Sequence, residues 1–298
     1  MIRVARDQSV FSLSAAATPV ARVRPGESFI LDTCDCFSDQ VQSADAALGG
    51  VDWEQINPAT GPVYVEGVEP GDVLCVRIDK IDVAQRGVMA VSGDFGVLRD
   101  QFEGIAFEMV PLEDGYAHVA GVRVPVRPMI GVIGVAPAGA PVACGSPGPH
   151  GGNMDTRIIG EGATVYFPVF APGALLAAGD LHAAMGDGEI CGTGVEIQGS
   201  IQLTVDVRRD LTLHEPVVET DDVVAAVASA ETLDAAAEQA TRHMAELLQV
   251  RMGLSPTATA TLMSAAGHLQ ISQVVDPLKT ARFSIAKDLL APLGGTLV

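Results

Sequence analysis

The chain has 298 residues, of which 48% are hydrophobic and 18% are charged, so it is long enough and apolar enough to bury a substantial core. Its formal net charge of -19 argues against nucleic acid and against anionic membranes as partners, because an acidic surface repels phosphate groups. The 32 glycines and 18 prolines suit many turns between short strands.

The start of the chain and its cysteines indicate the expected compartment. The first 20 residues contain no continuous apolar segment of the secretory kind, and the uncharged stretches 128–149 and 162–179 are interrupted by Pro and Gly. The five cysteines form an odd, sparse set, which is typical of reduced thiols. We therefore expect a cytoplasmic protein without a membrane span.

Short strands are predicted along most of the chain. The segments 28–32, 63–68 and 73–81 are β-prone, and the last of them (VLCVRIDKI) alternates apolar and polar residues, which is the period of a half-buried strand. Further strands are predicted at 123–135 and 164–170. A longer one is expected within 194–208, with these residues on one face: Ile201, Leu203, Val205 and Val207.

Two helices are predicted after residue 221. The segment 232–251 has helical spacing of apolar residues, with Thr232 as the N-cap and Gly253 as the stop. Ser255 and Pro256 begin a second helix that ends near Gly267. The pattern predicts a mainly β protein with a small α-helical C-terminal part.

A single domain over 1–298 is the simpler organisation. It would be β-rich over 1–220 and helix-containing over 221–298. A split into two domains near residue 220 stays open, because composition alone does not separate the two arrangements.

Polar residues gather in two glycine-rich stretches, 148–155 (GPHGGNMD) and 179–196 (GDLHAAMGDGEICGTGVE). Asp180 and His182 are two apart, so on a strand they point to the same face and converge on one point, as ligands of a divalent metal do. The pattern alone is weak, because an Asp beside a His is more often a hydrogen-bonded pair.

The first glycine-rich stretch adds His150 and Asp155 as candidate metal ligands. Gly151 and Gly152 let the backbone approach a ligand closely and are candidate substrate-binding positions. A plain glycine turn with a surface histidine is the alternative for this stretch taken alone. Two such pairs on separate loops favour the metal site.

Acidic residues in the second stretch are candidates for acid–base chemistry. Asp187 and Glu189 are predicted catalytic residues, with Glu189 preferred as the base that takes a proton from water. A solvated acidic turn is the alternative. Glu196 lies in an expected strand, where a buried carboxylate needs a metal or an arginine as partner.

A third candidate segment follows the strand at 28–32. Asp35 is a candidate metal ligand. Cys34 and Cys36 are too close for an ordinary disulfide and lack the spacing of a thiolate zinc pair. Cys191 is read as a structural thiol rather than a nucleophile, because no basic partner is evident.

Taken together, these motifs resemble the acetamidase/formamidase family. The resemblance extends from Arg22 to Pro292 and also includes PMIGVIGVAP at 128–137, GATVYFPVF at 162–170 and ISQVVDP at 271–277. It implies a CUB-like jelly-roll β-sandwich with appended helices, hydrolysis of formamide or acetamide, a divalent metal (zinc or calcium) and a homodimer or higher oligomer. Its H-G-G-N-x-D run adds Asn153 as a substrate-binding residue beside His150 and Asp155.

The chain departs from the family pattern at two places. Met185 stands where the family usually has Gln, which puts the substrate preference in doubt, because a thioether is a poor hydrogen-bonding group. His268 and Gln270 replace an Asp and an Arg near the end of the chain. Any ion pair that those two residues make elsewhere in the family is absent here.

The resulting hypothesis is metal-dependent hydrolysis of a short-chain aliphatic amide to a carboxylate and ammonia. In this hypothesis Glu189 moves the proton. The metal is held by some of the candidate ligands, which are Asp35, His150, Asp155, Asp180 and His182. The rivals are an amidase acting on a larger amide and a non-catalytic metal- or small-ligand-binding β-sandwich. Amidases with a catalytic lysine are disfavoured, because none of the three lysines lies beside a Gly/Ser-rich segment.

Overall fold

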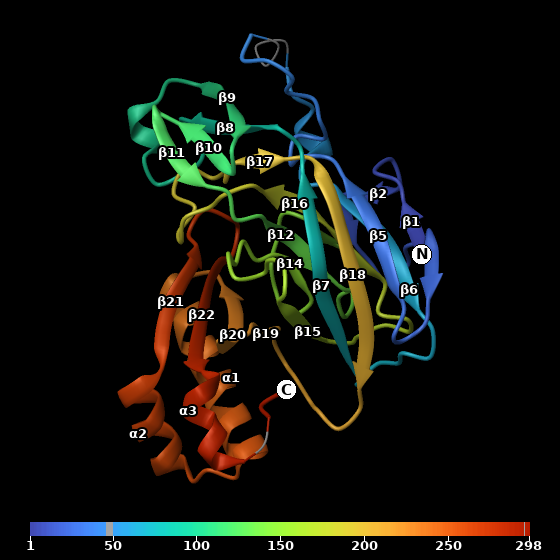
Figure 1. The fold of residues 1–298 in the computed structure, drawn as a ribbon, viewed down its shortest axis with the longest axis vertical. Helices are drawn as coiled ribbons and strands as arrows, with labels where there is room; N and C mark the ends of the chain where they lie inside the picture. The colour runs from blue at the N-terminus through green and yellow to red at the C-terminus, as the bar shows by residue number, and fades with distance from the viewer. Residues whose placement is uncertain (46–49, 295) are drawn as a thin grey trace.

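A computed structural model describes residues 1–45, 50–294 and 296–298 of the chain, and two large β-sheets dominate it (Figure 1). The nine-stranded sheet has this order: β1 (Ile2–Val4), β5 (Ser28–Thr33), β18 (Gly199–Arg208), β7 (Val73–Val83), β15 (Thr164–Pro168), β19 (Val217–Glu219), β20 (Val223–Ala230), β22 (Lys279–Ala286) and β21 (His268–Gln273).

The second sheet has eleven strands. Its main path has this order: β11 (Val122–Pro125), β10 (Tyr116–Val119), β9 (Ile105–Glu113), β8 (Arg86–Ser92), β17 (Glu196–Ile197), β16 (Leu176–His182), β12 (Met129–Gly134) and β14 (Gly151–Asn153). Off this path, β6 (Ala59–Val65) pairs with β16, and β2 (Ser9–Val10) and β4 (Ala21–Val23) pair with β6. The short strands β3 (Ser12–Leu13) and β13 (Val142–Ala143) pair with each other.

The two sheets pack face to face, and the largest apolar cluster lies between them. It contains Phe29 and Leu31 of β5 together with Ile130 of β12 and Leu181 of β16, all fully buried. Burying such side chains is the main stabilising contribution of a sandwich core. The structure therefore confirms the prediction of a mainly β sandwich with C-terminal helices.

The helices gather at one end of the molecule, opposite the β10–β11 hairpin (Figure 1). They are α1 (Leu233–Met252), α2 (Pro256–Ala266) and α3 (Lys287–Leu290). In the described part of the chain, 3-10 turns span Trp53–Gln55, Arg99–Gln101 and Ala291–Leu293. As predicted, Thr232 caps α1 by accepting a hydrogen bond from the Ala235 amide, and Gly253 ends the helix with a φ of 65°. None of the helices in the described ranges has the length and apolarity needed to cross a membrane.

The tertiary structure adds detail to the strand predictions at two places. The β-rich run at 123–135 forms two strands, β11 and β12, which are separated around Arg127 and Pro128 because proline has no amide to continue a ladder. The part after residue 221 contains strands as well as helices, and β20 pairs with β19 across residue 220. The nine-stranded sheet therefore continues through this point, while the single domain over 1–298 stays a prediction.

A pH dependence of stability follows from His243 on α1. Burial, aided by His214, lowers the pKa of His243 to about 4, below the 6.5 of an exposed histidine. Between these pH values the unfolded chain takes up a proton that the folded chain refuses, so stability falls as the pH falls through this window. We expect His243→Leu to remove roughly 3 kcal/mol of the stability loss between pH 7 and pH 4.

Urea unfolding at a series of pH values measures this effect. His268→Gln is the matched control, because His268 is exposed on β21 and should leave the pH slope unchanged. Equal pH slopes in the wild type and in His243→Leu would show that His243 does not titrate in this way.

Candidate active site

Four buried acidic side chains, a half-buried fifth and one histidine meet where the second sheet opens into its loops. Asp180 and His182 come from the end of β16, and His182 is the direct neighbour of Glu196 on β17. The other carboxyl groups come from loops: Asp155 after β14, Glu189 between β16 and β17, and Asp276 between β21 and β22. Strand pairing thus joins residues that lie far apart in sequence.

The imidazole of His182 lies at the centre of this cluster. Its Nε2 atom is 3.3 Å from Glu196 Oε1 and 3.6 Å from Asp180 Oδ1. The same nitrogen lies 3.8 Å from Asp155 Oδ1 and 3.9 Å from Glu189 Oε1. All these side chains are buried, so water screens their charges little.

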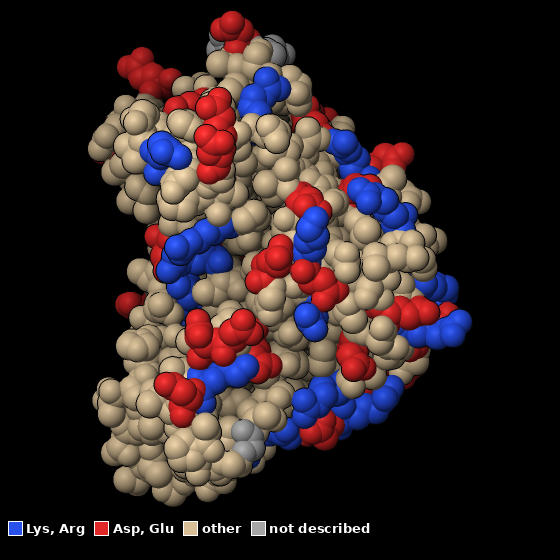
Figure 2. Space-filling model, in the orientation of Figure 1, with Lys and Arg blue, Asp and Glu red and all other residues tan. Residues whose placement is uncertain are grey.

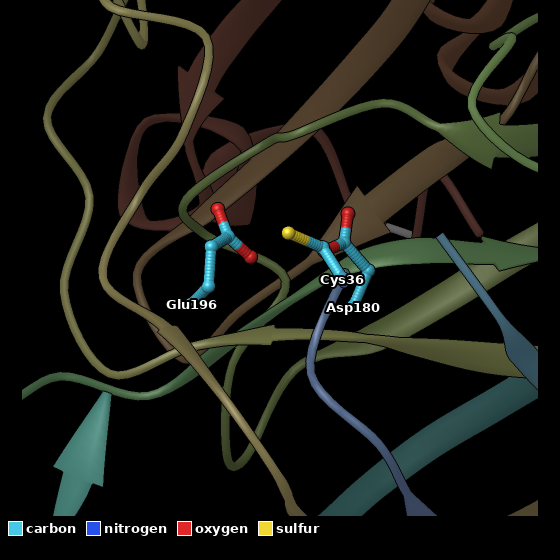
Figure 3. Close-up of side chains that lie close together, drawn as sticks. All are labelled: Cys36, Asp180 and Glu196. Carbon is cyan, nitrogen blue, oxygen red and sulfur yellow. The ribbon is translucent and has the colours of Figure 1, made fainter. Parts of the chain in front are cut away.

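Among the described residues, two neighbouring groups of donor atoms are compact enough to hold a cation. The donor atoms of Asp155, His182 and Glu189 lie within 4.8 Å of one another, and so do those of Cys36, Asp180 and Glu196. In the second group the Cys36 sulfur and the carboxyl groups of Asp180 and Glu196 approach one another from separate segments (Figure 3). Sulfur, imidazole and carboxylate together form the kind of mixed donor set that suits zinc.

The electrostatics of the cluster are those of crowded carboxyl groups with too little positive charge. Burial and the neighbouring Asp155 hold the pKa of Glu189 well above its usual value. Burial, with Asp180 nearby, raises the pKa of Glu196 to about 8, and burial raises that of Asp155 to about 6. Burial pulls the pKa of His182 down, but Glu196 and Asp180 outweigh it and raise that pKa well above 6.5.

The backbone at the cluster is unusual. Asp155, Asp180 and Glu189 all have left-handed φ angles, of 39°, 55° and 46°. L-residues adopt this region only when surrounding structure imposes it, at a cost of order 1–3 kcal/mol each. The three carboxyl groups are therefore aimed by the tertiary structure against local preference.

A cavity of about 480 Å³ opens onto the cluster, and we call it the acidic cavity. Its walls include four aromatic side chains: Phe11, Phe37, Trp53 and Phe95. Its ionisable lining residues are Cys36, Glu54, Asp180, Glu189, Glu196 and Asp276, with no Lys, Arg or His among the described lining residues. An apolar pocket with a few convergent polar groups is the usual form of a small-molecule site.

The structure brings five of the ten predicted site residues together. Asp155, Asp180, His182 and Glu189 lie in the cluster, and Asn153 lines the acidic cavity. The Asn153 Oδ1 atom is buried and has no hydrogen-bond partner among the described residues, so it is available to a ligand.

Other predicted site residues lie outside both donor groups. The Asp35 carboxylate accepts the amides of Phe37 and Asp39 and so stabilises the turn after β5. His150 is buried, and its Nε2 atom has no hydrogen-bond partner in the described part of the chain. The site roles predicted for both residues remain predictions.

Gly151 and Gly152 have a packing reason to be glycine. A Cβ at Gly151 would lie 2.3 Å from the Ile133 oxygen, and one at Gly152 would lie 2.4 Å from the Ser146 oxygen. Both have positive φ, and neither is a lining residue of the acidic cavity. Their substrate-binding role stays a prediction.

Two residues of the site went undetected in the sequence. Cys36 was considered only as part of a C-x-C pair, yet it reaches Asp180 and Glu196 where Asp35 was expected. The sequence marks Asp276 only as a turn residue before Pro277, although its Oδ2 atom is buried, its carboxyl group lies near Asp155 and the residue lines the acidic cavity. An acidic residue next to an apolar run (ISQVV) is the signal that marks Asp276.

Asp187 is held by Arg282, a fully buried arginine of β22. The guanidinium donates to Asp187 Oδ2 at 2.7 Å and Oδ1 at 2.9 Å, and also to Ser272 Oγ at 3.2 Å. Ser272 is linked in two directions, by its carbonyl to the amide of Gly188 and by its hydroxyl to Thr156. Arg282 thus ties down the residues next to both Glu189 and Asp155.

We expect Arg282→Met to destabilise the fold by about 3 kcal/mol, because it removes the donor of a buried hydrogen-bonded network and leaves Asp187 without its bidentate partner. Urea unfolding measures the change. The control is Arg242→Met, whose arginine makes an exposed i,i+4 pair with Glu238 and should change stability by about 0.5 kcal/mol or less. Equal, small effects of the two variants would contradict a stabilising network at Arg282.

The fold and the site define a class of protein: a β-sandwich with a buried imidazole–carboxylate cluster at a cavity that has aromatic walls. The family model described as "Acetamidase/Formamidase family" matches residues 15–144 and 142–289. The chain belongs to that family, as its motifs predicted.

Solved structures and characterised sequences agree with this membership. A predicted acetamidase/formamidase from Thermoanaerobacter tengcongensis is 50% identical with a TM-score of 0.96, and the match covers 98% of each chain. An acetamidase from Bacillus halodurans is 46% identical with a TM-score of 0.95, covering 98% of this chain and 100% of that one. A formamidase from Methylophilus methylotrophus is 28% identical over 252 residues, which cover 64% of this chain and 62% of the relative. The chain thus spans a little under two thirds of that relative's length.

Proposed function

We propose that the protein hydrolyses a short-chain aliphatic amide, of the formamide or acetamide type, to a carboxylate and ammonia with the help of a divalent metal. The observation that carries the proposal is the buried cluster of carboxyl groups around His182 at the base of the acidic cavity. Membership of the acetamidase/formamidase family supports the reaction class.

The donor atoms of the cluster fit a metal ion. Both carboxylate oxygens of Asp155 and the Oδ1 atom of Asp180 are buried without a hydrogen-bond partner among the described residues. Buried carboxylates without partners are costly unless a cation compensates them. Asp155, Asp180 and His182 would hold the ion, with Cys36 and Glu196 as further donors; zinc suits the sulfur and nitrogen atoms, and calcium the oxygens.

A divalent cation supplies Lewis-acid chemistry, since it lowers the pKa of nearby water and polarises a carbonyl oxygen. Glu189 takes the proton of the attacking water and later gives it to the departing nitrogen, a task for which its raised pKa suits it. Asn153 accepts an N–H of the amide through its free Oδ1 atom. The aromatic walls hold the acyl group and keep out bulk water.

Asp187 is also predicted as catalytic, and we propose that it acts as a positioning residue for the loop that carries Glu189. Its carboxylate is engaged with Arg282, and it lies two residues before Glu189. It therefore fixes the loop that carries the base rather than moving a proton itself.

Ammonia release from formamide, acetamide and propionamide tests the proposal, before and after chelation and with zinc or calcium added back. We expect activity that is lost on chelation and restored by one ion. Ligand binding without any ammonia release would instead favour a non-catalytic binding protein.

A larger amide is the second candidate substrate. The acidic cavity, at about 480 Å³, lies within the range of about 300–1,000 Å³ that drug-sized ligands occupy. Rising kcat/KM from acetamide to longer or aromatic amides would favour this candidate. A homo-oligomer and a cytoplasmic location stay proposals, and sedimentation of the purified chain tests the first.

A further inference from the structure

A second cavity of about 530 Å³ lies on the other side of the loop that carries Glu189, and we call it the arginine cavity. Glu189 and Thr193 line both cavities, so the two are separated only by this segment. Its remaining walls are largely apolar, with these side chains: Met89, Val119, Val124, Met185, Ile190 and Val195. Met185, the departure from the family pattern, therefore faces this cavity.

The two cavities differ in their basic residues. Arg127 and Arg157 line the arginine cavity together with Asp187 and Glu189, whereas the ionisable groups around the acidic cavity are acids and a thiol. Arg127 has no side-chain partner among the described residues. Arg157 lies 3.3 Å from Asp187, a carboxylate that Arg282 already neutralises through two hydrogen bonds.

Asp187 is thus shared between Arg157 and Arg282, and Arg127 stands in the arginine cavity without an ion-pair partner among the described residues, in a chain whose net charge is -19. Figure 2 shows a group of basic side chains at the left edge of the molecule, between the regions of the β10–β11 and β21–β22 hairpins of Figure 1. Guanidinium groups match the planar geometry of a carboxylate, and apolar walls suit a short alkyl chain.

We propose that the arginine cavity binds a short-chain aliphatic carboxylate, the anionic product of amide hydrolysis. The inference rests on the proposed function, which converts a neutral amide and water into a carboxylate and ammonia. A new anion beside Asp180, Glu196 and Asp276 is repelled there, while Arg127 and Arg157 attract it across the Glu189 segment.

Calorimetric titration of the metal-loaded protein with propionate tests the site without any turnover. We expect saturable binding that Arg127→Gln/Arg157→Gln weakens about tenfold or more, because charge-assisted hydrogen bonds are lost. Arg99→Gln is the matched control, since Arg99 is exposed and lines neither cavity, and it should leave the affinity unchanged. Arg127→Gln alone should weaken binding severalfold if the double variant does not fold.

The single tryptophan locates the ligand, because Trp53 lines the acidic cavity and not the arginine cavity. Its fluorescence should stay constant while propionate saturates the arginine cavity. Undiminished affinity in Arg127→Gln, quenching of Trp53 over the same titration, or no saturable binding would each overturn the proposal. Arginine-dependent binding in a protein that releases no ammonia would sink the proposed function and leave the carboxylate site standing.

Discussion

Glu189→Gln should lower kcat by about 10²–10⁴-fold while the bound metal and the fold are retained, because the variant keeps the shape of the side chain and removes its ability to carry a proton. The reason lies in the geometry: Glu189 is buried, lines the acidic cavity and lies 3.9 Å from His182 Nε2. Steady-state kinetics on acetamide, together with metal analysis of the same preparation, measure the two quantities separately.

The control for Glu189→Gln is Glu103→Gln, which neutralises an exposed carboxylate outside both cavities and should leave kcat unchanged. Near-normal turnover in Glu189→Gln would remove Glu189 as the base. Loss of the metal together with turnover would instead make Glu189 a metal ligand. The metal analysis tests this alternative because Glu189 belongs to the compact donor group with Asp155 and His182.

Gly131→Ala should lower the affinity of the protein for the metal by about 10–100-fold, with a matching loss of activity, because groups that orient metal ligands have effects of this size. A Cβ at Gly131 would lie 2.5 Å from Asp155 Oδ1 and 2.7 Å from Asp180 Oδ2, closer than any real contact. The backbone oxygen of Asp180, at 2.9 Å, cannot move aside as a side chain can. Glycine at this point of β12 is therefore what allows both carboxylates to approach each other.

Gly186→Ala is the matched control, because its Cβ would meet nothing within 4 Å and its backbone is not left-handed. Calorimetric titration with the metal ion compares the affinities of the two alanine variants. If Gly131→Ala bound metal as tightly as Gly186→Ala does, the carboxylates above Gly131 would not be ligands. Thermal unfolding checks that the methyl group at Gly131 costs only the roughly 1–3 kcal/mol of ordinary overpacking.

The cluster shows why its residues need a rigid sandwich around them. Three of its carboxyl groups are carried on left-handed backbone, and Asp180 adopts it within β16, near the end of the strand. Strain of this kind persists only where neighbouring strands over-determine the conformation. Here β12 and β17 flank β16, so the pairing that builds the sheet also aims the donors.

Local signals in the sequence determined the regular elements. Alternation predicted β7 and β18, and capping residues predicted both ends of α1, because period and cap depend on residues only a few positions apart. The same local patterns singled out Asp180, His182 and Glu189 by their glycine-rich surroundings, and the structure places all three in one buried cluster, while their roles stay predictions. The family resemblance supplied Asn153 and the class of fold.

Contacts between distant segments decided the rest. Asp35 and Cys36 are adjacent, and only the turn after β5, in which Asp35 accepts two amides, leaves the Cys36 sulfur beside Asp180 and Glu196. Arg282 is 95 residues from Asp187, and no local pattern predicts that pair. Burial raises the pKa of Glu189 and Glu196, and burial is a property of the assembled sheets. The sequence by itself determined which chemical groups are present, whereas the tertiary structure alone decided which of them meet, because strand register and desolvation depend on the whole fold.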